Sequence, residues 1–353
     1  MSTKKQVLFV DDEENILAGL RRLLRSQRKS WQLFFANSGE EALEILAKQP
    51  MDVIVSDMRM PELDGAALLD QVAEAYPHTM RVILSGQCHK SKLLQVVATA
   101  HQFLSKPCQP DKLIGSIQSA LNLQDSISSP ELRKAVSAVR SVPSPSGNIE
   151  RLKELTIDSD DLMPQLRELC TSDIGIAIKL LQLCNSSFFG RPNPGISIQN
   201  AVESIGGDLL LDLVQTGVFQ SVETPRLDRF LTRVNEHSLE VAQNAKSAID
   251  NPELAGLCYA GGLLHDVGKI VFALHWQDAY LDLIESATDD DTLVASEQEH
   301  FGVNHREAGR FLLQLWGLNG NVVNCAGDSL SENGEVSQVV CQIHRNVYQM
   351  CSL

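Results

Sequence analysis

Acidic side chains and a lysine stand directly after short apolar runs in the first third of the chain. Asp11 and Asp12 follow one run, Asp57 ends another, Ser85 ends a third, and Lys106 follows a fourth. Carboxylates that are brought together repel one another, so such a cluster persists with a hard divalent cation, and oxygen ligands suit Mg2+. A carboxylate beside Mg2+ and a lysine is a competent nucleophile toward phosphorus, because the cations neutralise charge on the transferring group. The predicted product is an aspartyl phosphate.

The elements that must position these residues alternate between strand and helix over residues 6–121. Apolar runs predict strands over Gln6–Val10, Gln32–Ala36, Val53–Asp57, Arg81–Ser85 and Gln102–Ser105. Helical spacing predicts helices over Ile16–Leu24, Glu40–Lys48, Ala66–Ala75 and Leu93–Ala100, and a last helix after Asp111 as its N-cap. This alternation predicts an α/β doubly wound domain, whose parallel sheet binds ligands at the carboxyl ends of its strands.

Four segments resemble those of response-regulator receiver domains: FVDDEEN, DVIVSDMRMPELDG, VILSG and FLSKP, within about residues 4–123. The resemblance implies that Asp57 is the phosphoacceptor. It also implies that Asp11 and Asp12 hold Mg2+ together with Asp57 and the backbone carbonyl of Arg59.

The same resemblance gives three further residues a role. Ser85 corresponds to the switch hydroxyl that bonds the phosphoryl group, and Lys106 corresponds to the ion-pairing lysine of the family. Phe103, three residues before Lys106, corresponds to the aromatic switch that turns inward on phosphorylation. Each of these residues alone could be an ordinary strand-end side chain, but their order along the chain favours the receiver interpretation.

Residues 126–150 mark a boundary, because they hold seven Ser, three Pro and Gly147. Pro130 to Arg140 is a credible short helix within this stretch. We therefore expect three parts: a receiver domain over 1–123, a linker helix and Ser/Pro-rich loop over 124–147, and an output domain over 148–353.

The output domain loses strand alternation and predicts an all-α domain. The expected helices are Leu162–Leu169, Ile174–Leu183, Leu209–Phe219, Leu227–Ile249, Leu254–Leu274, Ala279–Ser286, Asn304–Leu315 and Val336–Cys351. Within GGLLHDVGKIVFALH, residues 261–275, we expect His265, Asp266 and Lys269 on the helix face opposite the apolar residues. An adjacent His-Asp pair offers two ligands to a divalent metal. Two ligands alone do not make a metal site.

The output domain resembles the HD superfamily of metal-dependent phosphohydrolases, and more closely its HDOD branch. Besides GGLLHDVGK, the similar segments are KLLQLCNSSFFG, AVESIGG, NEHSLEVAQNA and NHREAG followed by LLQLWGL, within about residues 132–345. HDOD domains often follow receivers in bacteria and resemble catalytically reduced relatives of HD-GYP phosphodiesterases. The resemblance implies signalling through protein contacts.

Counting ligands indicates a degenerate site. His237, His265, Asp266 and His305 match positions of a vestigial metal site, but Ser329 and Leu330 replace a paired histidine, and the place of a final carboxylate falls near Gln342. Three protein ligands could still hold one metal. The simpler interpretation is a polar network in which Asp266 pairs with Lys269 or His237, so we expect no metal in this domain. We expect His344 to be an ordinary histidine, and Asp289 to Asp291 to be a solvated loop.

The resulting hypothesis is a two-component response regulator that accepts phosphate on Asp57 and signals through protein contacts of a catalytically reduced HDOD domain. The alternative is an enzyme, a receiver-controlled HD phosphohydrolase acting on a cyclic dinucleotide. The expected partners are a sensor histidine kinase or phosphotransfer protein and a downstream signalling protein, for which a cyclic di-GMP enzyme is one option. The sequence leaves open whether the protein forms a homodimer.

Composition excludes other classes of protein. Residues 1–125 hold 14 basic and 15 acidic side chains, whereas residues 126–353 hold 16 and 30, so the output half carries −14 of the net charge of −15. This acidity argues against nucleic-acid binding, which needs Lys and Arg at phosphates. We find no export signal and no membrane-length apolar run, and expect a cytoplasmic protein. The eight scattered cysteines are expected to be reduced and mostly buried.

Overall fold

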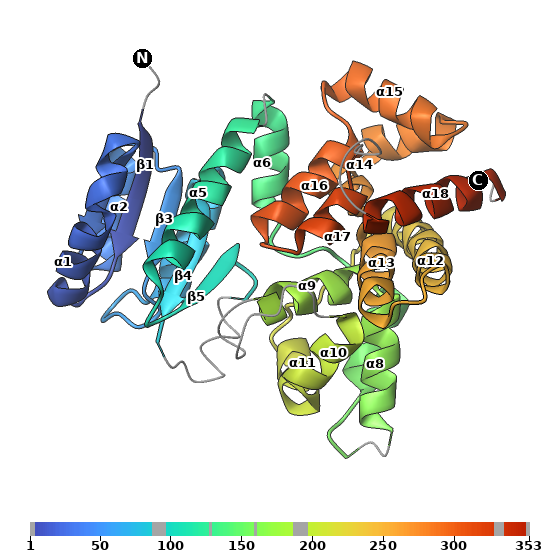
Figure 1. The fold of residues 1–353 in the computed structure, drawn as a ribbon, viewed down its shortest axis with the longest axis horizontal. Helices are drawn as coiled ribbons and strands as arrows, with labels where there is room; N and C mark the ends of the chain where they lie inside the picture. The colour runs from blue at the N-terminus through green and yellow to red at the C-terminus, as the bar shows by residue number, and fades with distance from the viewer. Residues whose placement is uncertain are drawn as a thin grey trace. The chain divides into compact units, whose positions relative to one another are not determined.

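The computed structural model describes residues 4–86, 97–126, 129–158, 161–185, 197–327 and 335–350 (Figure 1). The chain forms two compact units, one ending at Arg140 and the other beginning at Ser141. The first unit is an α/β domain and the second is helical, as predicted.

The first unit is built on a five-stranded parallel sheet in the order β2-β1-β3-β4-β5. Its strands are β1 (Lys5–Val10), β2 (Trp31–Ala36), β3 (Val53–Ser56), β4 (Met80–Ser85) and β5 (Gln102–Ser105). Every residue of β3 and β4 is buried, which is typical of a parallel sheet covered on both faces. Val10 pairs with Ser56 and Ser85 pairs with Ser105, so the residues that follow β1, β3, β4 and β5 meet at one edge.

Short polar side chains cap the N-termini of several helices in this unit. The helices are α1 (Glu14–Leu23), a 3-10 helix over Leu24–Lys29, α2 (Gly39–Lys48), α3 (Gly65–Ala75), α5 (Pro110–Ser126) and α6 (Pro130–Ala138). The side chains of Ser38, Asp64 and Ser129 accept a backbone N–H in the first turns of α2, α3 and α6, which satisfies donors that a helix start leaves open.

Three boundaries of this unit differ from the sequence-based expectation. Asp57 lies just outside β3, which ends at Ser56. Asp111 is in the first turn of α5 rather than at its N-cap, because the fixed φ of Pro110 suits the first helical position. The predicted helix Leu93–Ala100 does not reach Ala100, since residues 97–99 form a turn, and its first part lies outside the described residues.

Helix α6 packs onto the α/β unit through a buried arginine. The guanidinium of Arg81, at the start of β4, donates hydrogen bonds to the carbonyls of Thr79, Thr99 and Ser137 at 3.2, 2.9 and 3.2 Å. Ser137 lies in the last turn of α6, where carbonyls lack helical partners and a cation is favoured. Burial lowers the pKa of Arg81 to about 9. One side chain thus joins β4, the segment before β5 and the end of α6.

The second unit is all-α, as expected. Its helices are α7 (Ser146–Glu154), α8 (Leu162–Ser172), α9 (Ile174–Asn185), α10 (Ile198–Ile205), α11 (Gly207–Gln215), α12 (Pro225–Ser247), α13 (Pro252–Leu264), α14 (Val267–Ser286), α15 (Asp290–Phe301), α16 (His305–Leu315), α17 (Gly320–Cys325) and α18 (Glu335–Met350). Helices α7, α10, α15 and α17 were not predicted, and α11 ends before the expected Phe219.

The expected helix Leu254–Leu274 is two helices that meet at His265 and Asp266. The chain turns there, so the predicted separation into a polar and an apolar helix face is wrong. His265, Asp266 and Lys269 are all buried, with exposed fractions of 5%, 3% and 4%. Helix α14 is itself interrupted at Gln277, whose φ of 45° is outside helical geometry, which agrees with the separate helix expected over Ala279–Ser286.

Helices α13 and α14 form the centre of the helical unit. By length and composition the stretch Pro252–Ser286 is apolar enough to cross a membrane, contrary to the expectation that the chain has no apolar run of that length. In its most apolar window 89% of the residues are buried by other parts of the chain, which is typical of a core helix.

The described cysteines are free thiols, in agreement with the prediction. Cys170, Cys184, Cys258 and Cys325 are buried, and Cys108 and Cys341 are partly exposed. Burial raises the pKa of Cys170 above the range of a reactive thiol.

Helix α9 contains a buried lysine that should make the stability of the protein depend on pH. The ammonium of Lys179 donates to Gln182 Oε1 at 2.8 Å and lies 4.5 Å from the ring centre of Trp316. Burial lowers the pKa of Lys179 to about 7, so between pH 7 and 10.5 the unfolded chain binds more protons than the folded chain. The contribution of Lys179 to stability therefore rises with pH across that window.

Lys179→Met should raise the free energy of unfolding by about 1–4 kcal/mol at pH 7, in line with replacements of buried charges. The gain should shrink at pH 10, where little work is needed to deprotonate the lysine. Chemical denaturation at both pH values checks this, with the exposed Lys153→Met as the control. A gain of equal size at pH 10 would show that charge burial is not the cause.

Candidate functional site

The first site lies where β1, β3 and β5 end. Asp11 follows β1, Asp57 follows β3 and Lys106 follows β5. The Lys106 Nζ lies 2.5 Å from Asp11 Oδ2 and 2.5 Å from Asp57 Oδ1. Both carboxylates are buried, with exposed fractions of 2% and 8%. The structure therefore brings together three of the residues that the sequence predicted as a phosphorylation site.

Backbone groups hold the two carboxylates in place. The N–H of Glu13 donates to Asp11 Oδ1 at 3.0 Å, and the N–H of Arg59 donates to Asp57 Oδ2 at 2.6 Å. Burial raises the pKa of Asp11, and this outweighs its hydrogen bond with Lys106. Burial alone would lower the pKa of Lys106, but the two carboxylates raise it. A crowded pair of carboxylates with one ammonium is an environment in which a further cation is favourable.

The other residues predicted for this site lie around the same edge. Asp12 is exposed, beside Asp11. Ser85 is buried at the end of β4, and Phe103 is buried within β5 with 4% of its surface exposed. Arg59 contributes its backbone N–H to Asp57, while the predicted role of its carbonyl as a ligand stays a prediction.

A second site forms at the junction of α13 and α14. His265 and Asp266 occupy the junction, His237 comes from α12, and His344 comes from α18, which packs against both α12 and α13. Asp266 Oδ2 lies 3.4 Å from His265 Nε2 and 3.9 Å from His237 Nε2. The His265 and His344 ring centres are 4.4 Å apart. One ligand atom from each of the four residues lies within 4.8 Å of the others.

His344 corrects the sequence-based expectation, which treated it as an ordinary histidine. It lies on α18, the helix in which a final carboxylate was expected near Gln342. His344 follows Gln342 by two residues and is a histidine where the family motif implies an aspartate. His305, which had been grouped with His237, His265 and Asp266, belongs to a neighbouring group instead.

The histidines of this cluster have the protonation state that a metal ligand needs. His265 Nδ1 hydrogen-bonds the Gly262 carbonyl at 2.7 Å, so Nδ1 carries the proton and Nε2 keeps its lone pair. That Nε2 is buried and makes no hydrogen bond among the described residues. Burial lowers the pKa of His237 to about 4 and that of His344 to about 2. Neutral imidazoles with a carboxylate fit a divalent transition metal.

The neighbouring group shares Asp266 with the first. It consists of Asp266, Asp290 and His305, and their ligand atoms also lie within 4.8 Å of one another. His305 Nε2 is 3.9 Å from Asp266 Oδ1 and 3.7 Å from Asp290 Oδ1. Asp290 is buried in the first turn of α15, so the expectation of a solvated loop over Asp289 to Asp291 is wrong for this residue.

Two basic side chains form ion pairs with the carboxylates of this group. Lys269 Nζ lies 2.8 Å from Asp266 Oδ2 and 3.0 Å from Asp290 Oδ1, which agrees with the predicted pairing of Asp266 with Lys269. Arg306 pairs with Asp290 at 2.5 Å. Burial raises the pKa of Asp266, but the neighbouring His265 and the ammonium of Lys269 lower it further, so Asp266 is ionised.

Glu297 fixes the orientation of His305. This fully buried carboxylate lies 2.8 Å from both the backbone N and the Nδ1 of His305, and it accepts from the Tyr280 hydroxyl at 2.9 Å. A carboxylate only accepts, so Nδ1 of His305 carries the proton and its Nε2 faces Asp266 and Asp290.

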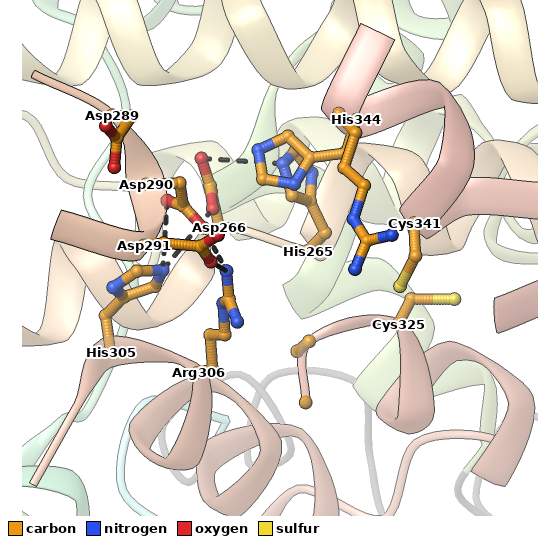
Figure 2. Close-up of a pocket in the computed structure, with 13 residues that line it drawn as sticks. His265, Asp266, Asp289, Asp290, Asp291, His305, Arg306, Cys325, Cys341 and His344 are labelled. Atoms are coloured by element: carbon orange, nitrogen blue, oxygen red, sulfur yellow. Dashed lines mark hydrogen bonds and ion pairs between the residues drawn. The ribbon is translucent and has the colours of Figure 1, made fainter. Parts of the chain in front are cut away.

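A pocket of about 240 Å3 opens onto both groups. Figure 2 shows Asp266 between His265 and His344 on one side and Asp290, His305 and Arg306 on the other. Arg306 and Arg345 bring positive charge to the pocket, and Cys325 and Cys341 also line it. Asp290, Glu297, Arg306 and His344 were not predicted as site residues, because they come from three helices, α15, α16 and α18, that only the fold brings together.

Comparison with known proteins finds two family models in this chain. The model of the response regulator receiver domain matches residues 7–118, and the model of the HDOD domain matches residues 142–328, a little more than half of the chain.

Curated relatives match the first part of the chain. The hydrogenase transcriptional regulatory protein HoxA of Cupriavidus necator is 35% identical over 127 residues, which cover 35% of this chain and 26% of that protein. The response regulator GtcR of Aneurinibacillus migulanus is 30% identical over 133 residues, covering 38% of this chain and 54% of that protein. The chain thus spans between a quarter and about half of the length of these relatives.

Two solved structures are also similar. The signal receiver domain of an HD domain-containing protein from Pseudomonas fluorescens Pf-5 is 30% identical, with a TM-score of 0.34, and covers 35% of this chain and 100% of that chain. The MmoQ response regulator from Methylococcus capsulatus is 23% identical, with a TM-score of 0.47, and covers 59% of this chain and 85% of that chain.

Proposed function

Since this chain belongs to the HDOD family and carries a response regulator receiver domain, we propose that phosphorylation of Asp57 controls signalling by the HDOD domain. The observation that carries the proposal is the pairing of Lys106 with Asp11 and Asp57 at the sheet edge. Receiver domains generally hold Mg2+ at this position and interact with sensor kinases or phosphotransfer proteins. In this chain Asp11, Asp12, Asp57 and the Arg59 carbonyl would hold the ion, which neutralises charge on the transferring phosphoryl group.

The chain's own residues then have distinct tasks. Asp57 supplies the carboxylate that attacks phosphorus, and the Arg59 N–H and Lys106 keep that carboxylate oriented. Ser85, at the end of β4, supplies the hydroxyl that bonds the phosphoryl group. Phe103, in β5, turns inward when Ser85 moves toward that group. The output acts through contacts of the HDOD domain with a downstream signalling protein, for which an enzyme of cyclic di-GMP metabolism is one class.

Coupling to α6 is supported by Arg81. Its guanidinium joins the carbonyl of Thr99, which precedes the switch strand β5, to the carbonyl of Ser137 in α6. Arg140, just after α6, also pairs with Glu74 of α3 at 3.7 Å. A shift of β5 would therefore reach α6, after which the chain enters the HDOD domain.

Hydrogen exchange of the full chain tests this coupling, with beryllium fluoride and Mg2+ as a phosphoryl mimic. Protection of residues 130–138 should change by a factor of about 5 to 150, which corresponds to a coupling of about 1–3 kcal/mol. Arg81→Met should keep the change around Asp57 and lose it in α6, and Asp57→Asn should lose both. Changes that stop at the phosphorylation pocket in the unmodified chain would contradict the proposal.

A second candidate function is metal-dependent phosphoester hydrolysis, with a cyclic dinucleotide as one substrate. The observation that favours it is the cluster of His237, His265, Asp266 and His344, in which His344 takes the place that the sequence gave to His305. A bound metal would supply an activated water there, while Arg306 and Arg345 would bind the phosphoryl oxygens. Turnover that disappears in His265→Ala with Asp266→Ala would favour this function over protein contacts alone.

A further inference from the structure

We propose that residues 142–148 form a strap through which the receiver domain acts on α12, the helix that carries His237. The inference rests on the proposed control of the HDOD domain by phosphorylation of Asp57, and it names the elements of that domain that receive the signal. Two sets of contacts support it: those that hold the strap on the HDOD domain, and those that connect the strap to α12.

The chain passes from the first unit to the second between Arg140 and Ser141. On the receiver side, Arg140 pairs with Glu74 of α3 at 3.7 Å. On the other side, the carbonyl of Val142 lies against Gly175 in the first turn of α9, so closely that a Cβ on the glycine would overlap it. Contacts with the two units thus begin two residues apart. Two residues span at most about 7 Å of chain, so little slack lies between them.

Asp173 and a backbone carbonyl hold the strap on the HDOD domain. The hydroxyl of Ser144 donates to Asp173 Oδ1 at 2.6 Å, and the side-chain amide of Asn148 donates to Asp173 Oδ2 at 2.8 Å. The backbone N–H of Ser144 donates to the carbonyl of Gln220, just before α12, at 2.8 Å. Asp173 is fully buried, and a buried carboxylate that loses its donors costs free energy. The strap is therefore built into the HDOD domain.

The strap also contacts α12 directly. The backbone N–H and the hydroxyl of Ser146 donate to the two carboxylate oxygens of Asp228 at 2.7 and 2.9 Å. Asp228 lies in the first turn of α12, a continuous helix of 23 residues. Since a helix is a rigid element, a displacement of the strap is applied to α12 as a whole.

A second connection reaches α12 nearer to the pocket. Asn235 accepts the N–H of Ile174 at 2.9 Å and donates to the carbonyl of Ser172 at 2.7 Å, so it holds the residues on both sides of Asp173. Asn235 is buried and precedes His237 by two residues. Within one turn, α12 is therefore joined to the segment that the strap holds and carries a histidine of the candidate site.

Lengthening the joint tests the inference. Gly-Ser-Gly-Ser is inserted between Arg140 and Ser141 of the full chain, and hydrogen exchange is measured with and without beryllium fluoride and Mg2+. In the unmodified chain this phosphoryl mimic should change protection about 5-fold or more in both α6 and α12. The insertion should keep the change in α6 and abolish it in α12, because the added slack absorbs the displacement. The control is the same insertion between Ile157 and Asp158, in the exposed turn after α7, which should keep both changes.

The possible outcomes separate the strap from the function on which it rests. A change in α12 that survives the longer joint would overturn the inference, and so would an unmodified chain in which α6 responds and α12 does not. No response in α6 of the unmodified chain would instead refute the proposed control of the HDOD domain by phosphorylation. The strap itself then depends on a measurement without the mimic.

Gly175→Ala provides that measurement. A Cβ on Gly175 would overlap the carbonyl of Val142 and the hydroxyl of Ser144, so the substitution should displace the strap and speed exchange in α12 about 5-fold or more. Gly147→Ala is the control, since a Cβ there would meet no atom within 4 Å and exchange should stay unchanged. Ser146→Ala only deletes a hydroxyl, needs no rearrangement to fold, and should show a smaller increase in α12. Exchange in α12 that is equal in Ser146→Ala, Gly147→Ala and the unmodified chain would show that the strap does not act on this helix.

Discussion

Asp57→Asn should abolish phosphoryl transfer to this protein. The unmodified chain should gain one phosphoryl group from acetyl phosphate and Mg2+, because Asp57 is the carboxylate that Lys106 and the Arg59 N–H hold at the sheet edge. Asparagine has nearly the same shape but is not nucleophilic toward phosphorus, so the variant should fold and stay unlabelled. Intact-protein mass spectrometry at short times measures the added mass.

The matched control is Asp111→Asn, an exposed aspartate in the first turn of α5. This variant should be labelled like the unmodified chain. Lys106→Met should lower the rate of labelling strongly and leave the site of labelling unchanged, because Lys106 acts by orientation and charge. Labelling that persists in Asp57→Asn would place the phosphoacceptor elsewhere.

The strands and the candidate phosphorylation site of the receiver domain could largely be predicted, because the residues that define them are close together in the sequence. Strands of four to six apolar residues and the carboxylates after them are adjacent in sequence, and parallel pairing brings strand ends together without further knowledge. The role of Arg81 was not predictable in this way. Its partners Thr99 and Ser137 lie 18 and 56 residues further along the chain, and only the packing of α6 shows why an arginine is buried there.

The site in the HDOD domain was predicted only in part, because its residues converge from separate helices. His265 and Asp266 are adjacent and were found at once, and His237 was found through its resemblance to a family motif. His344 and Asp290 have no neighbour in sequence that marks them. The glycines near the junction carry a further signal that sequence alone could not interpret, since they show where helix backbones touch.

Gly268 marks the closest of these contacts, and Gly268→Ala should destabilise the HDOD domain severely. Helices α14 and α16 pack against each other there, and a Cβ on Gly268 would overlap the backbone carbonyl of His305. Backbone cannot rotate away as a side chain can, so the helices must separate. We expect a loss of about 3 kcal/mol or more in the free energy of unfolding, at the upper end of overpacking effects.

Chemical denaturation followed by circular dichroism measures this loss, and Gly320→Ala is the matched control. Gly320 is the first residue of α17 in the same domain, and a Cβ there would meet no atom within 4 Å, so its effect should stay within about 0.5 kcal/mol. The displaced backbone belongs to His305, which faces Asp266 and Asp290, so Gly268→Ala should also disturb the pocket. A Gly268→Ala chain as stable as Gly320→Ala would show that α14 and α16 do not touch at this glycine.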